Sequence, residues 1–123
     1  MLPDNLKFTK DHEWLRVEAD VVILGVTDYA QGELGDIIFI ELPEIDQKFR
    51  KDDILGTIEA VKTVADIYMP IDGKVVSVNL EIEDSPELVN SDPFGKGWLV
   101  KLKTENFSDF DLLSKKEYLE LIS

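Results

Sequence analysis

Residues 58 to 67 read I-E-A-V-K-T-V-A-D-I, a stretch that is nearly a mirror image of itself about Lys62 and Thr63. The symmetry is typical of a β-hairpin, and it predicts that Val61 faces Val64, Ala60 faces Ala65, Glu59 faces Asp66, and Ile58 faces Ile67. Because side chains alternate between the two faces of a strand, one face of this hairpin is apolar or small. That face contains Ile54, Gly56, Ile58, Ala60, Ala65, Ile67 and Met69. The stretch therefore predicts a half-buried hairpin with Lys62 at its tip.

The tip of this hairpin has an unfavourable sequence. Two-residue hairpin loops favour Asn-Gly or Gly-X, whereas this chain has Lys62 and Thr63. In the predicted register Glu59 and Asp66 face each other, which costs some stability because like charges repel across a strand pair. A single exposed lysine usually serves only solubility. The combination of a poor turn, symmetric arms and flanking acids instead favours an acylation site at Lys62.

Four segments resemble, in the same order, signature stretches of the H protein family of the glycine cleavage system. They are K-F-T-K-D-H-E-W-L-R-V at 7–17, G-V-T-D-Y-A-Q-G-E-L-G-D-I-I-F-I-E-L-P at 25–43, G-T-I-E-A-V-K-T-V-A-D-I-Y-M-P-I-D-G-K-V-V-S-V-N at 56–79 and E-L-V-N-S-D-P-F-G-K-G-W-L-V-K-L at 87–102. The third segment is similar to that family's lipoyl-lysine pattern, E-S-V-K-A-x-S-D-x-Y-x-P-x-x-G. It departs from the pattern at Ala60, Thr63 and Ala65.

The resemblance implies a carrier and not an enzyme. Lys62 is expected to hold lipoate in amide linkage, Glu59 and Asp66 to be recognised by the lipoylating enzyme, and Glu13 and Glu33 to border a cleft for the arm. The implied partners are a pyridoxal-phosphate glycine decarboxylase, a tetrahydrofolate-dependent aminomethyltransferase and dihydrolipoamide dehydrogenase. They would in turn load an aminomethyl group, pass on its one-carbon unit with release of ammonia, and reoxidise the dithiol.

The implied fold is mainly β, a barrel-sandwich hybrid of the lipoyl and biotinyl carrier type with short flanking helices. An internal repeat supports two quasi-equivalent antiparallel halves, because G-D-I-I-F-I-E-L at 35–42 is echoed by G-K-V-V-S-V-N-L at 73–80, an offset of 73 − 35 = 38. We expect one domain over residues 1–123. It comprises an N-terminal extension over about 1–20, a core over about 21–103 and C-terminal helices over about 104–123.

Individual elements are indicated outside the hairpin. Strands are predicted at Val21–Val26 and Trp98–Lys103. Trp14 is expected to lie in the core or at its edge. A short helix is expected over 29–34, ending at Gly35, and another opens at Ser85-Pro86-Glu87, with Pro at its first position. S-D-F-D at 108–111 and S-K-K-E at 114–117 are typical starts of C-terminal helices.

Composition excludes several function classes. Thirteen basic and 26 acidic residues give a net charge of −13, which disfavours nucleic acid because phosphate binding needs clustered basic residues. The acidity serves solubility, or steers the chain toward basic surfaces on partner enzymes. The chain contains no cysteine, and His12 is its one histidine, so we expect neither thiol catalysis nor a metal site. No signal or membrane segment is indicated, and we expect a monomer in the cytoplasm, or a processed organellar chain.

Two other functions are compatible with the sequence around Lys62. The chain could pass lipoyl groups to other enzymes as a relay, or it could be an unmodified scaffold that keeps the carrier fold. Biotin carriage is less favoured, because the biotinyl lysine usually lies between methionines, whereas Lys62 lies between Val61 and Thr63.

Overall fold

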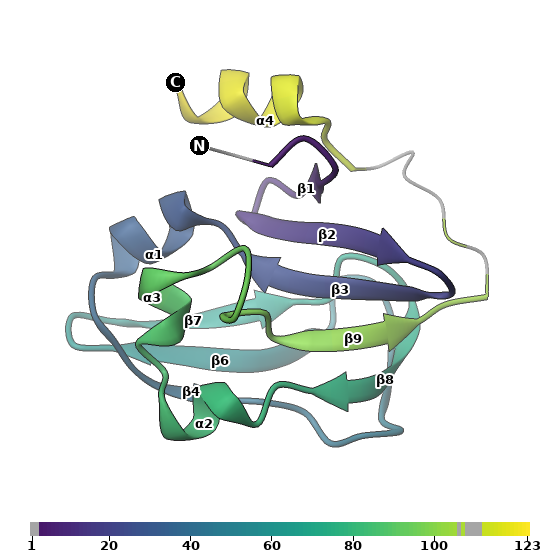
Figure 1. The fold of residues 1–123 in the computed structure, drawn as a ribbon, viewed down its shortest axis with the longest axis horizontal. Helices are drawn as coiled ribbons and strands as arrows, with labels where there is room; N and C mark the ends of the chain where they lie inside the picture. The colour runs from purple at the N-terminus through teal and green to yellow at the C-terminus, as the bar shows by residue number, and fades with distance from the viewer. Residues whose placement is uncertain (1–2, 106, 108–111) are drawn as a thin grey trace.

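The structure is a computed structural model that describes residues 3–105, 107 and 112–123, leaving aside the side chains of residues 30 and 31. It consists of two antiparallel sheets with short helices around them (Figure 1). One sheet has six strands in the order β1-β2-β3-β9-β8-β5, and the other has three in the order β4-β6-β7. The expected mainly β fold is therefore confirmed, although the strands of the described residues do not close into a barrel.

The described residues contain nine strands and four helices. The strands are β1 (Lys7–Phe8), β2 (Glu13–Glu18), β3 (Val21–Val26), β4 (Ile37–Glu41), β5 (Lys48–Phe49), β6 (Ile54–Ala60), β7 (Val64–Tyr68), β8 (Gly73–Val78) and β9 (Val100–Lys103). The helices are α1 (Asp28–Leu34), α2 (Glu81–Asp84), α3 (Leu88–Ser91) and α4 (Lys115–Ile122). No helix in the described part of the chain is both long and apolar enough to span a membrane.

The main core lies between the two sheets. Leu24, Val75 and Leu102 of the six-stranded sheet belong to the same buried apolar cluster as Ile58 and Ile67 of the three-stranded sheet. Each fully buried aliphatic side chain of this kind contributes roughly 1.5–3 kcal/mol relative to an exposed one. The core therefore fixes which face of the β6–β7 hairpin points inward.

A second apolar cluster attaches α4 to the N-terminal strands. The rings of Phe8 and Tyr118 stack with their centroids 4.6 Å apart, and the buried Trp14 donates its indole N–H to the carbonyl of Pro93 at 3.0 Å. Ser114 caps α4 in a capping box with Glu117, as the S-K-K-E sequence predicts. Through β1 and β2, the N-terminal extension forms part of the six-stranded sheet.

The β6–β7 hairpin has the predicted faces but a register different from the predicted one. Ile58 pairs with Ala65, Glu59 with Val64 and Thr57 with Asp66, so the arms are shifted by two residues from the mirror arrangement. A shift of two residues keeps every side chain on its face, and Ile58, Ala60 and Ile67 are buried as expected. The predicted facing of Glu59 and Asp66 is wrong.

A β-bulge changes the start of the hairpin. The register of β6 against β7 shifts between Ile54 and Gly56, so that Leu55 is buried whereas Ile54 is 53% exposed. The assignment of Ile54 to the apolar face is therefore wrong, because the extra residue of a bulge moves the alternation by one position.

The internal repeat of the sequence corresponds to a repeat in the structure. β4 pairs with β6 and β8 with β9, and each pair contains a register shift, between Ile37 and Phe39 in one and between Val75 and Ser77 in the other. These bulges lie 38 residues apart, the same offset as the repeated sequences. Two quasi-equivalent antiparallel units are thus present, one in each sheet.

The remaining predicted elements are close to those observed. The helix expected over 29–34 is α1, and Gly35 follows it with a φ of +84°. The closing strand begins at Val100, two residues later than predicted, and the helix expected from Ser85 begins at Leu88 after a turn. The sequence analysis did not predict α2, and the S-D-F-D segment lies outside the described residues.

Candidate functional site

Lys62 lies in the turn that connects β6 to β7. The backbone N–H of Ala60 donates to the carbonyl of Thr63 at 2.8 Å, so the turn itself consists of Val61 and Lys62. Both residues are exposed, with Val61 at 71% of its full accessibility. The predicted placement of Lys62 at an exposed hairpin tip is confirmed.

The tip is supported by the loop that follows α1. The N–H of Val61 donates to the carbonyl of Asp36 at 3.1 Å, and the Lys62 side chain lies over Gly35. A β-carbon at Gly35 would be 3.6 Å from Cε of Lys62 and 3.8 Å from its Nζ. The methylene stem of Lys62 therefore rests on a backbone surface that has no side chain of its own.

Asn90 of α3 holds this loop in place. Its amide nitrogen donates to the carbonyl of Gly35 at 2.9 Å, and its amide oxygen accepts the N–H of Ile37 at 3.0 Å. One side chain thus bridges the residue before and the residue after Asp36. The carbonyl of Asp36 in turn accepts the N–H of Val61, so α3 stabilises the turn indirectly, through the loop that contains Asp36.

The outer face of the three-stranded sheet combines apolar and acidic side chains beside the turn. Phe39 and Val64 lie directly opposite Glu59 on either side and are 51% and 61% exposed. Asp66, also exposed, faces Thr57. Glu59 and Asp66 are therefore diagonal neighbours, a relation in which Cα atoms lie about 7–8 Å apart. A role of Glu59 and Asp66 in recognition by a modifying enzyme stays a prediction.

Glu13 occupies a different environment from that of a solvated acid. It is 2% exposed, and its carboxylate accepts the backbone N–H of Tyr68 at 2.9 Å and the hydroxyl of Thr9 at 3.2 Å. It thereby links β2 of one sheet to β7 of the other. Burial raises the pKa of Glu13 to about 8, although both hydrogen bonds act in the opposite direction. Tyr68 is four residues along β7 from Val64, which corresponds to about 14 Å.

Glu33 lies on the exposed side of α1, two residues before Gly35. Its charge acts on His12, whose pKa is lowered by burial and raised to a smaller extent by Asp11 and Glu33. His12 is itself hydrogen-bonded through Nδ1 to the hydroxyl of Tyr118 at 2.8 Å. The structure therefore brings the end of α1 close to both the Lys62 turn and the segment that contains Glu13. A role of Glu13 and Glu33 in a cleft for the arm stays a prediction.

The arrangement offers an accessible amine on Lys62. Among the described residues no set of three or more His, Cys, Asp or Glu side chains is arranged to hold a metal ion. Lys62 presents its amine on a turn fixed by backbone hydrogen bonds, which suits a covalent acyl attachment. Sequence reasoning did not identify Gly35, Asp36 and Asn90 as supports of the turn. Gly35 was predictable as the residue that ends a helix, whereas no local sequence pattern indicates the role of Asn90.

Comparisons with known proteins agree with this arrangement. The family model described as glycine cleavage H-protein matches residues 6–123. The glycine cleavage system H protein of Staphylococcus haemolyticus is 51% identical over 122 residues, which cover 98% of this chain and 97% of that protein. The glycine cleavage system H protein of Staphylococcus carnosus is 50% identical with the same coverage. A crystal structure of a glycine cleavage system H protein from Mycobacterium marinum has a TM-score of 0.89 at 33% identity and covers 97% of both chains.

Proposed function

The chain belongs to the glycine cleavage H-protein family, and from this we propose that it acts as a carrier in glycine cleavage with a lipoyl group attached to Lys62. The observation that carries the proposal is the position of Lys62. It lies on an exposed two-residue turn, and its stem rests on Gly35. Members of this family carry a modified lysine, and in this chain Lys62 is the exposed lysine at the corresponding hairpin turn.

The residues around the turn fit an amide-linked lipoyl group. The amine of Lys62 is accessible, and Gly35 leaves the space beside its methylene stem open. The hydrogen bond from Val61 to Asp36 holds the backbone of the turn in place, so that a modifying enzyme meets a fixed loop and loses little conformational entropy on binding it. Lipoate held by Lys62 would supply a cyclic disulfide, the oxidised form that can take up an aminomethyl group and that reoxidation of the dithiol restores.

The chain's own contribution is to tether and position. About ten single bonds of roughly 1.5 Å between the Lys62 backbone and the end of a lipoyl arm give a reach on the order of 12 Å. A tether of this length brings the end of the arm into recessed active sites at a high effective concentration.

The proposed partners all act at this turn. These partners are a pyridoxal-phosphate glycine decarboxylase, a tetrahydrofolate-dependent aminomethyltransferase, dihydrolipoamide dehydrogenase and a lipoylating enzyme. The exposed Phe39, Val61 and Val64 offer apolar contact area beside Lys62, and Glu59 and Asp66 offer charge. In this proposal the chain is a cytoplasmic monomer that meets each enzyme in turn and catalyses none of the steps.

Intact-mass measurement and peptide mapping test the attachment. Protein from cells that lipoylate their proteins is expected to carry one lipoyl adduct, on Lys62, and its formal charge then changes from −13 to 12 − 26 = −14. Lys62→Arg is expected to fold with a stability change within about 0.5 kcal/mol, as at other surface sites, and to lose all activity in a reconstituted glycine cleavage assay. Lys10→Arg, at an exposed position near the N-terminus, is the matched control. An adduct on another lysine, or activity retained by Lys62→Arg, would overturn the proposal.

A further inference from the structure

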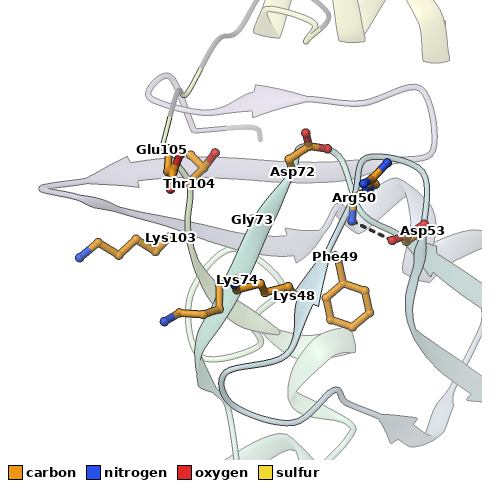
Figure 2. A pocket seen from close by; sticks show the side chains of 10 residues that line it. All are labelled: Lys48, Phe49, Arg50, Asp53, Asp72, Gly73, Lys74, Lys103, Thr104 and Glu105. Carbon is orange, nitrogen blue, oxygen red and sulfur yellow. Dashed lines mark hydrogen bonds between the residues drawn. The ribbon is translucent and has the colours of Figure 1, made fainter.

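A large cleft opens at the end of the sheets opposite the Lys62 turn. In Figure 1 the β6–β7 turn lies at the left, whereas β8 begins and β9 ends at the right. The cleft at this right-hand end has a volume of about 610 Å³. Its lining consists of Lys48, Phe49, Arg50, Asp53, Asp72, Gly73, Lys74, Lys103, Thr104 and Glu105 (Figure 2). Neither Lys62 nor any other predicted site residue is part of this lining.

Three lysines of this cleft form a row across three neighbouring strands. Lys48 of β5 is directly opposite Lys74 of β8, and Lys74 is directly opposite Lys103 of β9. Directly opposite residues share a face, and strands lie 4.7–4.9 Å apart, so the row spans about 10 Å. The neighbouring pair Val75 and Leu102 is buried in the core, which places the lysine row on the outer face. Figure 2 shows Lys74 and Lys103 extending toward the same side.

Repulsion between the facing lysines lowers the stability of the sheet, and nearby acids offset this loss only weakly. Like charges directly opposite each other destabilise a strand pair, and Lys74 takes part in two such pairs. Its ammonium is 3.9 Å from Asp46, and that of Lys103 is 3.5 Å from Asp20. Both acids are largely exposed, and exposed pairs of this kind contribute little. In a chain of net charge −13, three positive charges in one row are therefore unexpected on grounds of stability alone.

Two of the three acids that line the cleft, Asp53 and Asp72, bind backbone groups at its edge, and the third is Glu105. A carboxylate oxygen of Asp53 accepts the backbone N–H of Arg50, and one of Asp72 accepts the backbone N–H of Lys51, both at 2.7 Å. These two carboxylates thus stabilise the turns at the edge of the cleft. Arg50 and Thr104 add further donors to the lining.

We propose that this cleft binds a small multivalent anion, and that an extended oligophosphate is the class of ligand that fits it. An ammonium group is a compact point charge with three donors, which suits phosphate oxygens. Three such charges in a line match an anion whose charges are spread along a chain. The volume of the cleft lies within the range usual for small-molecule sites. The proposed site is separate from the Lys62 turn and does not depend on the carrier function.

Inorganic tripolyphosphate is the probe for this site. At constant ionic strength, an amide NMR titration is expected to show saturable shifts concentrated in β5, β8 and β9, with a Kd on the order of 1 mM or tighter. The thermal unfolding midpoint is expected to rise with the probe, because a ligand of the folded state stabilises it. Sodium chloride at matched ionic strength is expected to produce neither effect. Shifts without saturation, or an equal effect of sodium chloride, would overturn the proposal.

Variants of the middle lysine separate binding from stability. Lys74→Gln removes both facing pairs, so its unfolding midpoint without the probe is expected to exceed that of the unaltered protein, while its affinity falls about tenfold, equivalent to 1.4 kcal/mol. Lys74→Arg is expected to keep the affinity. Lys116→Gln, an exposed lysine on α4, is the matched control and is expected to bind normally. Undiminished binding by Lys74→Gln, or an equal loss in Lys116→Gln, would refute the site. Lys48→Gln provides the same test at the edge strand.

Discussion

Replacing Glu13 by Gln is expected to remove most of the pH dependence of folding above neutral pH. The Glu13 carboxylate is buried between the two sheets and accepts hydrogen bonds from Tyr68 and Thr9. A glutamine amide oxygen can accept the N–H of Tyr68, its NH2 group can donate to the hydroxyl oxygen of Thr9, and the side chain carries no charge at any pH. The substitution therefore keeps the link between β2 and β7 while it removes the titration.

The size of the effect follows from the pKa of Glu13, which is about 8 in the folded protein against a usual value of 4.5. The folded state holds this proton more tightly than the unfolded state. The stabilisation by the proton is therefore complete below the lower value and is lost as pH rises toward about 8. At 1.36 kcal/mol per pKa unit, the loss between about pH 6.5 and about pH 8.5 amounts to about 2 kcal/mol.

Urea unfolding followed by tryptophan fluorescence measures this loss. Below about pH 6.5 His12 acts in the opposite sense, because burial lowers its pKa and its charging in acid favours the unfolded state; the comparison is therefore made above that pH. The unaltered protein is expected to lose about 2 kcal/mol across the interval, and Glu13→Gln to stay nearly level. Glu33→Gln, at an exposed acid of α1, is the control and should retain the original slope. A level curve for the unaltered protein, or an unchanged slope in Glu13→Gln, would refute the reasoning.

Three further substitutions test other parts of the structure. Gly35→Ala is expected to lower the free energy of unfolding by about 1–2 kcal/mol, since a φ of +84° is unfavourable for a residue with a side chain; urea unfolding measures this, and a neutral result would argue against the left-handed conformation. Ser114→Ala is expected to cost about 1 kcal/mol by removing the cap of α4, with faster amide exchange in that helix, and unchanged exchange would speak against the capping box. Glu59→Lys is expected to leave stability within about 0.5 kcal/mol, because Glu59 faces Val64 and no acid, while its rate of lipoylation falls; a normal rate would mean that Glu59 is only solvated surface.

The sequence predicted the faces of the hairpin better than its register. Alternation of apolar and polar residues decides which side chains are buried, and a shift of two residues leaves that alternation unchanged. The mirror symmetry of residues 58–67 therefore could not distinguish a turn at Lys62 and Thr63 from the observed turn at Val61 and Lys62. The bulge at Ile54 was unpredictable for a related reason, because Ile54 and Leu55 are equally apolar and only packing decides which is buried.

Other parts of the site depend on contacts between distant segments. The burial of Glu13 arises because β7 of the opposite sheet brings the Tyr68 N–H to its carboxylate, 55 residues away in sequence. The support of the turn by Asn90 likewise crosses 55 residues to Gly35. Neither contact has a local sequence pattern. Lys62 was predictable because the features that identify it lie within a few residues of it.

The two-fold repeat has a consequence for where this chain can gain sequence. Ile58 corresponds to Val100, because they pair with Ile40 and Val78, which are 38 residues apart, and the partners of Ile58 and Val100 in β7 and β3 are Ala65 and Leu24. Three residues beyond Ile58 and Ala65 toward the tip lie residues 61 and 62, which form the turn. Three residues beyond Val100 and Leu24 in the other unit lie residues 103 and 21. One hairpin tip is thus a continuous turn, whereas its counterpart is left open by the ends of the core. The chain enters the core at 21 and leaves it at 103 at this open tip, so sequence can be inserted at these two junctions without altering the turn that presents Lys62. The strand β2 itself is not free to change, because it pairs along β3 and contains the buried Glu13 and Trp14.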